Sequence, residues 1–188
     1  MRASEFRLSV VPRRVGSRPR KVADRRLRWH ARMHIAQVNP QPAPAPLVIR
    51  FGALGDMVLL TPLLRQLHRR YGQPCRVLGS GAWLETLFDS NPDVRDVLVL
   101  RSRKRPYWLD RSQQAMVKAL RAQPPGPVYI CDDYARDKIR WLLTRAGIAP
   151  ERCIYANPDC LLRREEHWID RWLRFGAMTP RAFAPMPG

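Results

Sequence analysis

Residues 47–72 read LVIRFGALGDMVLLTPLLRQLHRRYG and decide the fold prediction. The run at 47–51 is short, apolar and β-branched, which is typical of a buried strand. Apolar residues at helical spacing follow, and Gly72 stands where a helix C-terminal cap is expected. Pro62 fits the first helical turn if Thr61 is the N-cap, so we predict a tight turn at 52–60 and a helix after it.

The same alternation continues along the rest of the chain. Strand-like runs occur at 75–80, 96–100, 128–133 and 153–156, and helical patterns at 82–90, 112–123, 135–148 and 164–176. Strands that alternate with helices at this spacing predict an α/β fold, a Rossmann-like parallel sheet with helices on both faces. We expect this domain at 46–177, a basic, Pro-rich disordered extension and linker at 1–45, and a linker or truncated end at 178–188.

The charge is strongly basic and unevenly distributed. Residues 1–32 hold eleven basic and two acidic residues, a net +9 of the chain's +18. This surplus predicts attraction to polyanions such as nucleic acid, anionic lipid or phosphorylated sugars. The segment is interpreted either as a basic arm that rests on an anionic surface or as an artefact of a start codon placed before Met33.

Other features narrow the class of protein. The four cysteines show no metal-ligand spacing, so we expect reduced thiols in a cytoplasmic protein. No apolar run reaches the roughly 18 residues of a membrane span, and the N-terminus lacks the apolar stretch of a secretory signal.

The turn at 52–56 is the best candidate for chemistry. Gly52 and Gly55 bracket the crossing from strand to helix, where the backbone turns sharply or approaches a ligand. The segment lacks the third glycine of a dinucleotide fingerprint and the Gly-Lys-Ser/Thr of a P-loop. Asp56 follows at the edge where open parallel sheets bind ligands, so it could accept a proton from a sugar hydroxyl or simply cap a helix.

The segment 47–72 resembles the opening of glycosyltransferase family 9, the heptosyltransferases, in its Gly-Asp loop and its TPLL helix. Weaker similarity extends through WLETLFDSNPDVRDVLVL, VYICDDYARDKIRWLLTRAGI and HWIDRWLRFG, and so covers about 46–176. The sequence departs from the family at 51–53, where many members carry Ser or Thr. The resemblance implies the N-terminal, acceptor-side half of a two-domain GT-B architecture, with Asp56 as the general base.

The family resemblance also implies the substrates and partners. The donor would be ADP-heptose, bound by a C-terminal domain that this sequence lacks, and the acceptor a lipopolysaccharide core of the Kdo-lipid A type. We therefore expect a chain that is inactive alone, that needs no cofactor or metal, and that works with a separate C-terminal domain chain. The expected location is the cytoplasm, at the anionic inner face of the inner membrane, without nucleic acid as a partner.

Basic residues supply candidates for acceptor binding, since arginine matches phosphates and carboxylates well. They follow the strands at 96–100 and 128–133: Arg101, Arg103, Lys104 and Arg105, beside Tyr107 and Trp108, and then Arg136 and Lys138. The alternative is a solvated, charged loop. On nearby helices we expect a structural His167, a core-facing Trp141, and Glu165 and Glu166 as charges at a helix N-terminus.

Two functions from other classes stay open. The basic arm favours a nucleic-acid-binding protein, although the sequence holds no recognisable nucleic-acid-binding motif. A Rossmann-like fold without transferase chemistry would be a binding module for a nucleotide or a partner protein.

Overall fold

The computed structural model describes residues 44–101, 105–132 and 136–184. The basic extension, most of the linker and the last four residues lie outside the described residues. The strands are β1 (Leu47–Ile49), β2 (Cys75–Gly79), β3 (Val94–Val99), β4 (Val128–Ile130) and β5 (Cys153–Tyr155). The helices are α1 (Leu54–Val58), α2 (Thr61–Tyr71), α3 (Trp83–Phe88), α4 (Arg111–Ala122), α5 (Arg136–Arg145), α6 (Ala156–Asp159) and α7 (Trp168–Ala177), with 3₁₀ turns η1 (Tyr107–Leu109), η2 (Pro150–Arg152) and η3 (Arg181–Phe183).

All five strands form one parallel sheet in the order β3-β2-β1-β4-β5, which confirms the predicted fold class. Val48 of the central strand lies between Val77 and Tyr129. The chain adds β2 and β3 on one side of β1 and then crosses to add β4 and β5 on the other. The strand order therefore reverses between β1 and β4, and the carboxyl ends of these strands form the crevice where such sheets bind ligands.

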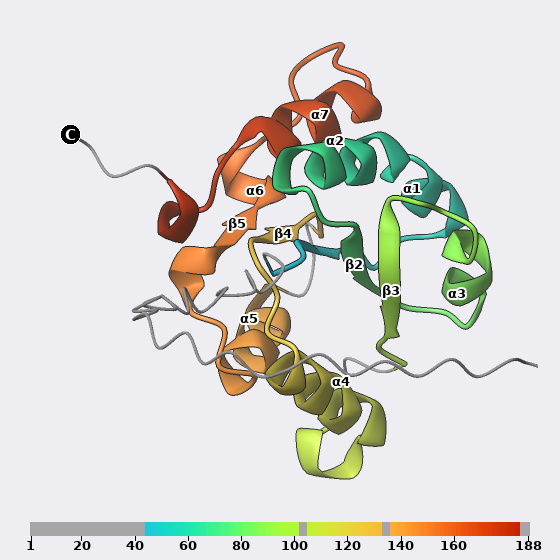
Figure 1. Ribbon diagram of the computed structural model, residues 1–188, viewed down its shortest axis with the longest axis vertical. Coiled ribbons are helices and arrows are strands. Elements are labelled where there is room, and N and C mark those ends of the chain that lie inside the picture. Colours follow the sequence, from blue (N-terminus) through green and yellow to red (C-terminus); the bar gives the residue numbers. More distant parts are fainter. Residues whose placement is uncertain (1–43, 102–104, 133–135, 185–188) are drawn as a thin grey trace, which may run out of the picture. The chain divides into compact units, whose positions relative to one another are not determined.

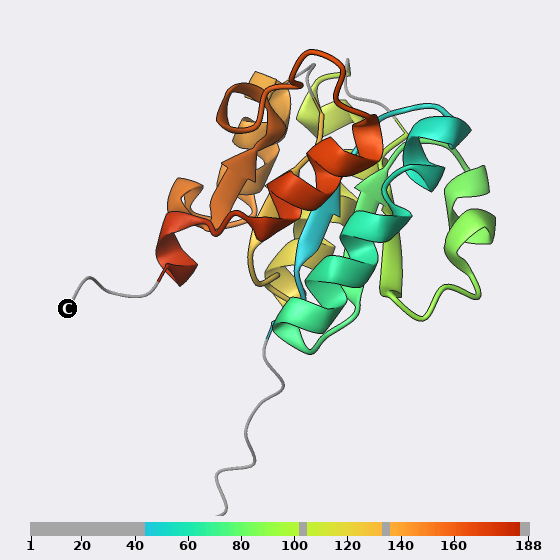
Figure 2. The same ribbon diagram turned by 90° about the horizontal axis from the view of Figure 1, so that it is seen from above.

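Helices cover the two faces of the sheet (Figures 1 and 2). Val48 and Tyr129 pack with α2 and α7 on one face, whereas Leu47, Ile49 and Ile130 pack with α4 and α5 on the other. This alternation follows from the two-residue period of a strand, and it makes both faces of the central strands apolar. The result is two cores separated by the sheet.

Helices α2 and α7 lie side by side and pack closely (Figures 1 and 2). A Cβ atom added at Gly176 would lie 2.6 Å from Leu63 Cδ1 and 2.6 Å from Gln66 Oε1. Trp172 and Phe175 of α7 are completely or almost completely buried beneath this contact. The absence of a side chain at Gly176 thus allows α7 to approach α2 and to cover the apolar side chains there.

The start of α2 differs in detail from the sequence prediction. The short helix α1 occupies much of the predicted 52–60 turn, and Leu60 rather than Thr61 is the N-cap of α2. Thr61 is the first helical residue, and its Oγ1 donates a hydrogen bond to the carbonyl oxygen of Val58 at 2.8 Å. Pro62 lies in the first turn as expected, where its missing N–H leaves no hydrogen bond unmade.

The last helix begins later than predicted. His167 is its N-cap, with Nδ1 accepting a hydrogen bond from the Ile169 N–H at 3.2 Å, so the structural role expected for this histidine is confirmed. The glutamates precede the helix instead of occupying its first turn, and that prediction was wrong. Glu166 instead forms an ion pair with Arg174 at 2.7 Å, and this pairing lowers its pKa to about 2.

Trp141 was also predicted wrongly. Helix α5 buries Ile139, Leu142 and Leu143 against the sheet, which turns Trp141 away from the core and leaves it 43% exposed. Within the described ranges, no helix has the length and apolar character needed to cross a membrane.

Candidate functional site

Asp56 lies just beyond the carboxyl end of β1, in the third position of α1. Its Oδ2 accepts a hydrogen bond from the Ala53 N–H at 2.9 Å, and its Oδ1 lies 3.3 Å from Arg50 Nη2. The side chain is nevertheless 41% exposed. Asp56 therefore caps α1, as one reading of the sequence expected, and still presents its carboxylate to solvent.

Gly52 makes room for this carboxylate. A Cβ atom at Gly52 would collide with Asp56 Cβ and would lie 2.6 Å from Oδ2 and 2.8 Å from Cγ. Gly55 is different, because a Cβ atom there would meet nothing within 4 Å. The geometry thus explains a glycine at position 52 through Asp56 and gives no reason for a glycine at position 55.

Arg50 connects Asp56 with the neighbouring strand. Its side chain is 12% exposed, and Nη1 donates to the carbonyl oxygen of Cys131, directly after β4, at 2.5 Å. The guanidinium therefore bridges the carboxyl ends of β1 and β4, where the strand order reverses. Arg50 was not among the residues predicted for the site, although a single arginine at the end of an apolar strand was a signal for it.

A second arginine, Arg171, connects the segment after β5 to the contacts around Arg50. Arg171 is buried, and it donates from Nε to the carbonyl oxygen of Cys160 at 2.8 Å and from Nη2 to that of Ala156 at 3.2 Å. Trp172 lies near both guanidinium groups, with its ring centroid 5.5 Å from Arg50 Cζ and 5.0 Å from Arg171 Cζ. These cation–π contacts and hydrogen bonds fix the segments after β1, β4 and β5 relative to one another.

The predicted basic residues form a second group. Arg101 and Arg105 are exposed and line a hollow of about 940 Å³ beside β3 and α4, together with Arg111. Lys138 Nζ donates to the carbonyl oxygen of Arg105 at 3.5 Å, so α5 meets the same loop. Arg103 and Lys104 lie outside the described residues, as does the side chain of Arg136, which begins α5.

Asp110 is the acidic residue on this side of the hollow. It is buried, and it accepts hydrogen bonds from the Ser112 hydroxyl and from the N–H groups of Ser112 and Gln113. These bonds, with that of the Ser112 hydroxyl the strongest, lower the pKa of Asp110 below its usual value. Its carboxylate is thus committed to capping α4, while the arginines around it face solvent.

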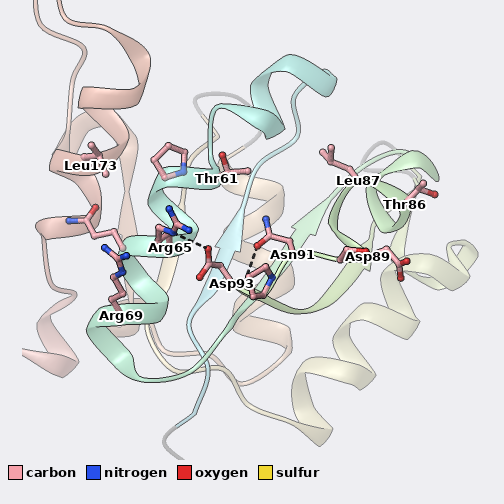
Figure 3. A pocket seen from close by; sticks show the side chains of 13 residues that line it. Thr61, Arg65, Arg69, Thr86, Leu87, Asp89, Asn91, Asp93 and Leu173 are labelled. Carbon is pink, nitrogen blue, oxygen red and sulfur yellow. Dashed lines mark hydrogen bonds and ion pairs between the residues drawn. The ribbon is translucent and has the colours of Figure 1, made fainter.

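A further hollow of about 1080 Å³ lies between α2 and the segment that links α3 to β3 (Figure 3). Asp93 forms its floor and is engaged by His68 Nδ1 at 2.8 Å and by Arg65 Nε at 3.8 Å. The Asp93 N–H in turn donates to Asn91 Oδ1 at 2.9 Å. These polar groups hold the amino end of β3 against α2, and none of the residues predicted for the site lines this hollow.

Comparisons with known proteins bear on the fold. No family model matches the chain, and no curated protein sequence matches it. A solved structure, the glycosyl transferase family 9 protein from Veillonella parvula DSM 2008, is similar, with a TM-score of 0.56 and 16% sequence identity. The match covers 70% of this chain and 40% of that protein, so this chain shares its fold over less than half of that protein's length.

Proposed function

We propose that the described domain is the acceptor-side half of an inverting glycosyltransferase and that Asp56 is its general base. The observation that carries this proposal is the half-exposed carboxylate of Asp56 at the reversal of strand order, with one oxygen oriented by Arg50 and the other by the Ala53 N–H. A carboxylate that is oriented before the substrate arrives loses little freedom when it accepts a proton.

In the proposed reaction, an acceptor hydroxyl attacks the anomeric carbon of a sugar nucleotide. The new C–O bond forms as the bond between that carbon and the diphosphate oxygen breaks, and the diphosphate leaves with the electron pair. The hydroxyl proton passes to Asp56. The capping bond does not prevent this transfer, because each carboxylate oxygen has a second lone pair.

At a finer level, we propose that heptose is transferred from ADP-heptose to a lipopolysaccharide inner core. Arg101 and Arg105 would hold the phosphates and carboxylates of a Kdo-lipid A acceptor, because both are exposed at the hollow after β3. The donor would be bound by the second half of a GT-B enzyme. The chain by itself would then bind acceptor and transfer little or no sugar.

Two measurements test the proposal on the full chain. Calorimetric titration with the deacylated saccharide of a heptose-deficient lipopolysaccharide should give saturable binding. The changes R101Q and R105Q should each weaken binding about threefold to fivefold, as expected for exposed charge pairs. The matched control R69Q removes an exposed arginine near the far end of α2 and should leave binding unchanged.

Equal weakening by R69Q would show that the saccharide responds to net charge or binds in the hollow that Arg69 lines, and either result would refute the proposed acceptor site. The second measurement is turnover with ADP-heptose and the intact heptose-deficient lipopolysaccharide. We expect none above background, and rapid transfer by this chain alone would contradict the need for a donor-side half.

A further inference from the structure

Trp141 of α5 lies on the protein surface, where a large apolar side chain needs an explanation. Ile139 and Leu142 fill the buried side of the helix and leave the indole 43% exposed. An aromatic ring stabilises a fold most when it is fully buried, and Trp141 gives up part of that gain. The contacts of the ring therefore indicate what the tryptophan does at this position.

The Trp141 ring is the centre of a cluster of aromatic and cationic side chains. Tyr107 of the η1 turn meets it edge to face, with 5.6 Å between the ring centroids. Lys138 Nζ lies 5.1 Å from the Trp141 centroid. Arg145 Cζ lies 5.1 Å from the same centroid and 4.3 Å from that of Tyr107, so its guanidinium contacts both rings. These T-shaped and cation–π contacts join α5 to the η1 turn.

The cluster holds residues 105–107, which come after the carboxyl end of β3. The carbonyl oxygen of Arg105 accepts hydrogen bonds from Gln113 Nε2 of α4 at 3.0 Å and from Lys138 Nζ at 3.5 Å. Lys138 is itself placed against the Trp141 ring. Helices α4 and α5 lie side by side (Figure 1), so both of them hold this segment. The exposed Arg105 side chain therefore extends from a backbone that is fixed on two sides.

We propose that Trp141, together with Arg145, is a positioning residue for acceptor binding and holds Arg105 where its guanidinium can reach an anionic group of the acceptor. This inference rests on the proposed function, in which Arg105 binds the acceptor at the hollow that it lines. It adds two residues that touch no substrate and act only through residues 105–107. A side chain held in place before binding loses less freedom when it binds, so a positioned arginine binds an anion more tightly than a mobile one.

Arg101 supplies a contrast that separates positioning from general stability. It directly follows Leu100, whose N–H donates to the carbonyl oxygen of Gly79 at 2.8 Å, so the sheet places its backbone. The cluster places Arg105 instead. If Trp141 only stabilised the domain, its loss would affect both arginines alike, whereas a positioning role affects Arg105 and spares Arg101.

The first test is calorimetric titration of the full chain with the deacylated saccharide of a heptose-deficient lipopolysaccharide. W141A should weaken binding about threefold to fivefold, as much as R105Q, and W141A/R105Q should bind no more weakly than R105Q alone. In W141A/R101Q the two losses should multiply, because the sheet places Arg101. W141F keeps a ring against Tyr107 and should recover most of the wild-type affinity.

A matched pair of arginines controls for net charge. R145Q removes the guanidinium that contacts both rings and should weaken binding about threefold. R140Q removes the same charge from the same helix, but Arg140 lies over Tyr155 of β5, with 5.5 Å from Cζ to the ring centroid. R140Q should therefore leave binding unchanged.

The second test is amide hydrogen exchange of the free chain, which needs no ligand. The N–H groups of Leu109 and Asp110 are bonded within the η1 turn, so W141A should speed their exchange about tenfold and leave that of Leu100 unchanged. Unchanged exchange in the turn would overturn the inference, and so would losses in W141A and R105Q that multiply in full. Weakening by R105Q without weakening by W141A would refute this inference alone. No saturable binding by the wild type would refute the proposed function and this inference with it.

Discussion

The replacement of Gly52 by alanine tests how the Asp56 turn is built. The added Cβ would lie 2.6 Å from Asp56 Oδ2 and 2.8 Å from Cγ, so the carboxylate must move. Its movement breaks the capping bond to the Ala53 N–H and the contact with Arg50. A lost cap costs about 1 kcal/mol, and the half-exposed ion pair adds at most about 1 kcal/mol. We therefore expect G52A to lower the free energy of unfolding by about 1–2 kcal/mol.

Gly55 supplies the matched control. A Cβ atom there meets nothing within 4 Å, and the residue lies inside α1 with a helical backbone. Because alanine favours a helix over glycine by up to about 1 kcal/mol, G55A should leave the domain equally stable or stabilise it. The assay is urea unfolding of the full chain, followed by circular dichroism, with the midpoints of both variants compared at equal slope.

A double-mutant cycle then isolates the cause. If G52A acts by colliding with the Asp56 side chain, it should cost little more once that side chain and its Cβ have been removed, so G52A/D56G should unfold close to D56G alone. Full additivity of the two single changes would refute the reasoning. A G52A variant as stable as the wild type would refute it as well.

Three other perturbations follow from the same contacts. R50Q should destabilise the domain by about 2 kcal/mol, because it removes a mostly buried charged donor from the Cys131 carbonyl; an unfolding midpoint equal to that of wild type would contradict this role. W172A should cost about 3–5 kcal/mol in the same urea assay, since the indole is almost fully buried, and a loss below about 1 kcal/mol would contradict its place in the core. The lowered pKa of Glu166, about 2 against an ordinary 4.5, means that pairing with Arg174 stabilises the fold above pH 4.5 and that this stabilisation is lost as the pH falls toward 2. E166Q should therefore be less stable than wild type at pH 7 and equal to it near pH 2, and a constant difference across an acid titration of stability would argue against the pairing.

The fold was predictable because its signals are local and repeated. Runs such as 47–51 and 75–80 are mostly apolar, and helical patterns separate them, so a parallel sheet covered on both faces was the natural solution. The boundaries were less accurate. The sequence at 52–60 contains glycines and indicated only a turn, so the short helix α1 was not predicted. Because α1 occupies this stretch, Leu60 becomes the N-cap of α2 and Thr61 its first residue.

The site was predictable only in part. The position of Asp56 at a sheet edge followed from the strand-turn-helix pattern, but its partners did not. Arg50 reaches Cys131, 81 positions away in sequence, and a contact of that range depends on strand order. Trp141 was predicted as core because large apolar residues on a helix usually face inward. Here Ile139, Leu142 and Leu143 already fill the buried side of α5.

The most direct test of the proposed site is to map where an acceptor saccharide binds to the domain. Amide chemical shifts of the isotopically labelled chain would be followed during titration with deacylated, heptose-deficient lipopolysaccharide, for the wild type and for D56N, which can keep the capping bond but cannot act as a base. We expect saturable shifts centred on residues 50–57 in both proteins, reaching Arg101 and Arg105. Shifts confined to the 1080 Å³ hollow between α2 and the segment that links α3 to β3, or no saturable shifts near Asp56, would contradict the proposal.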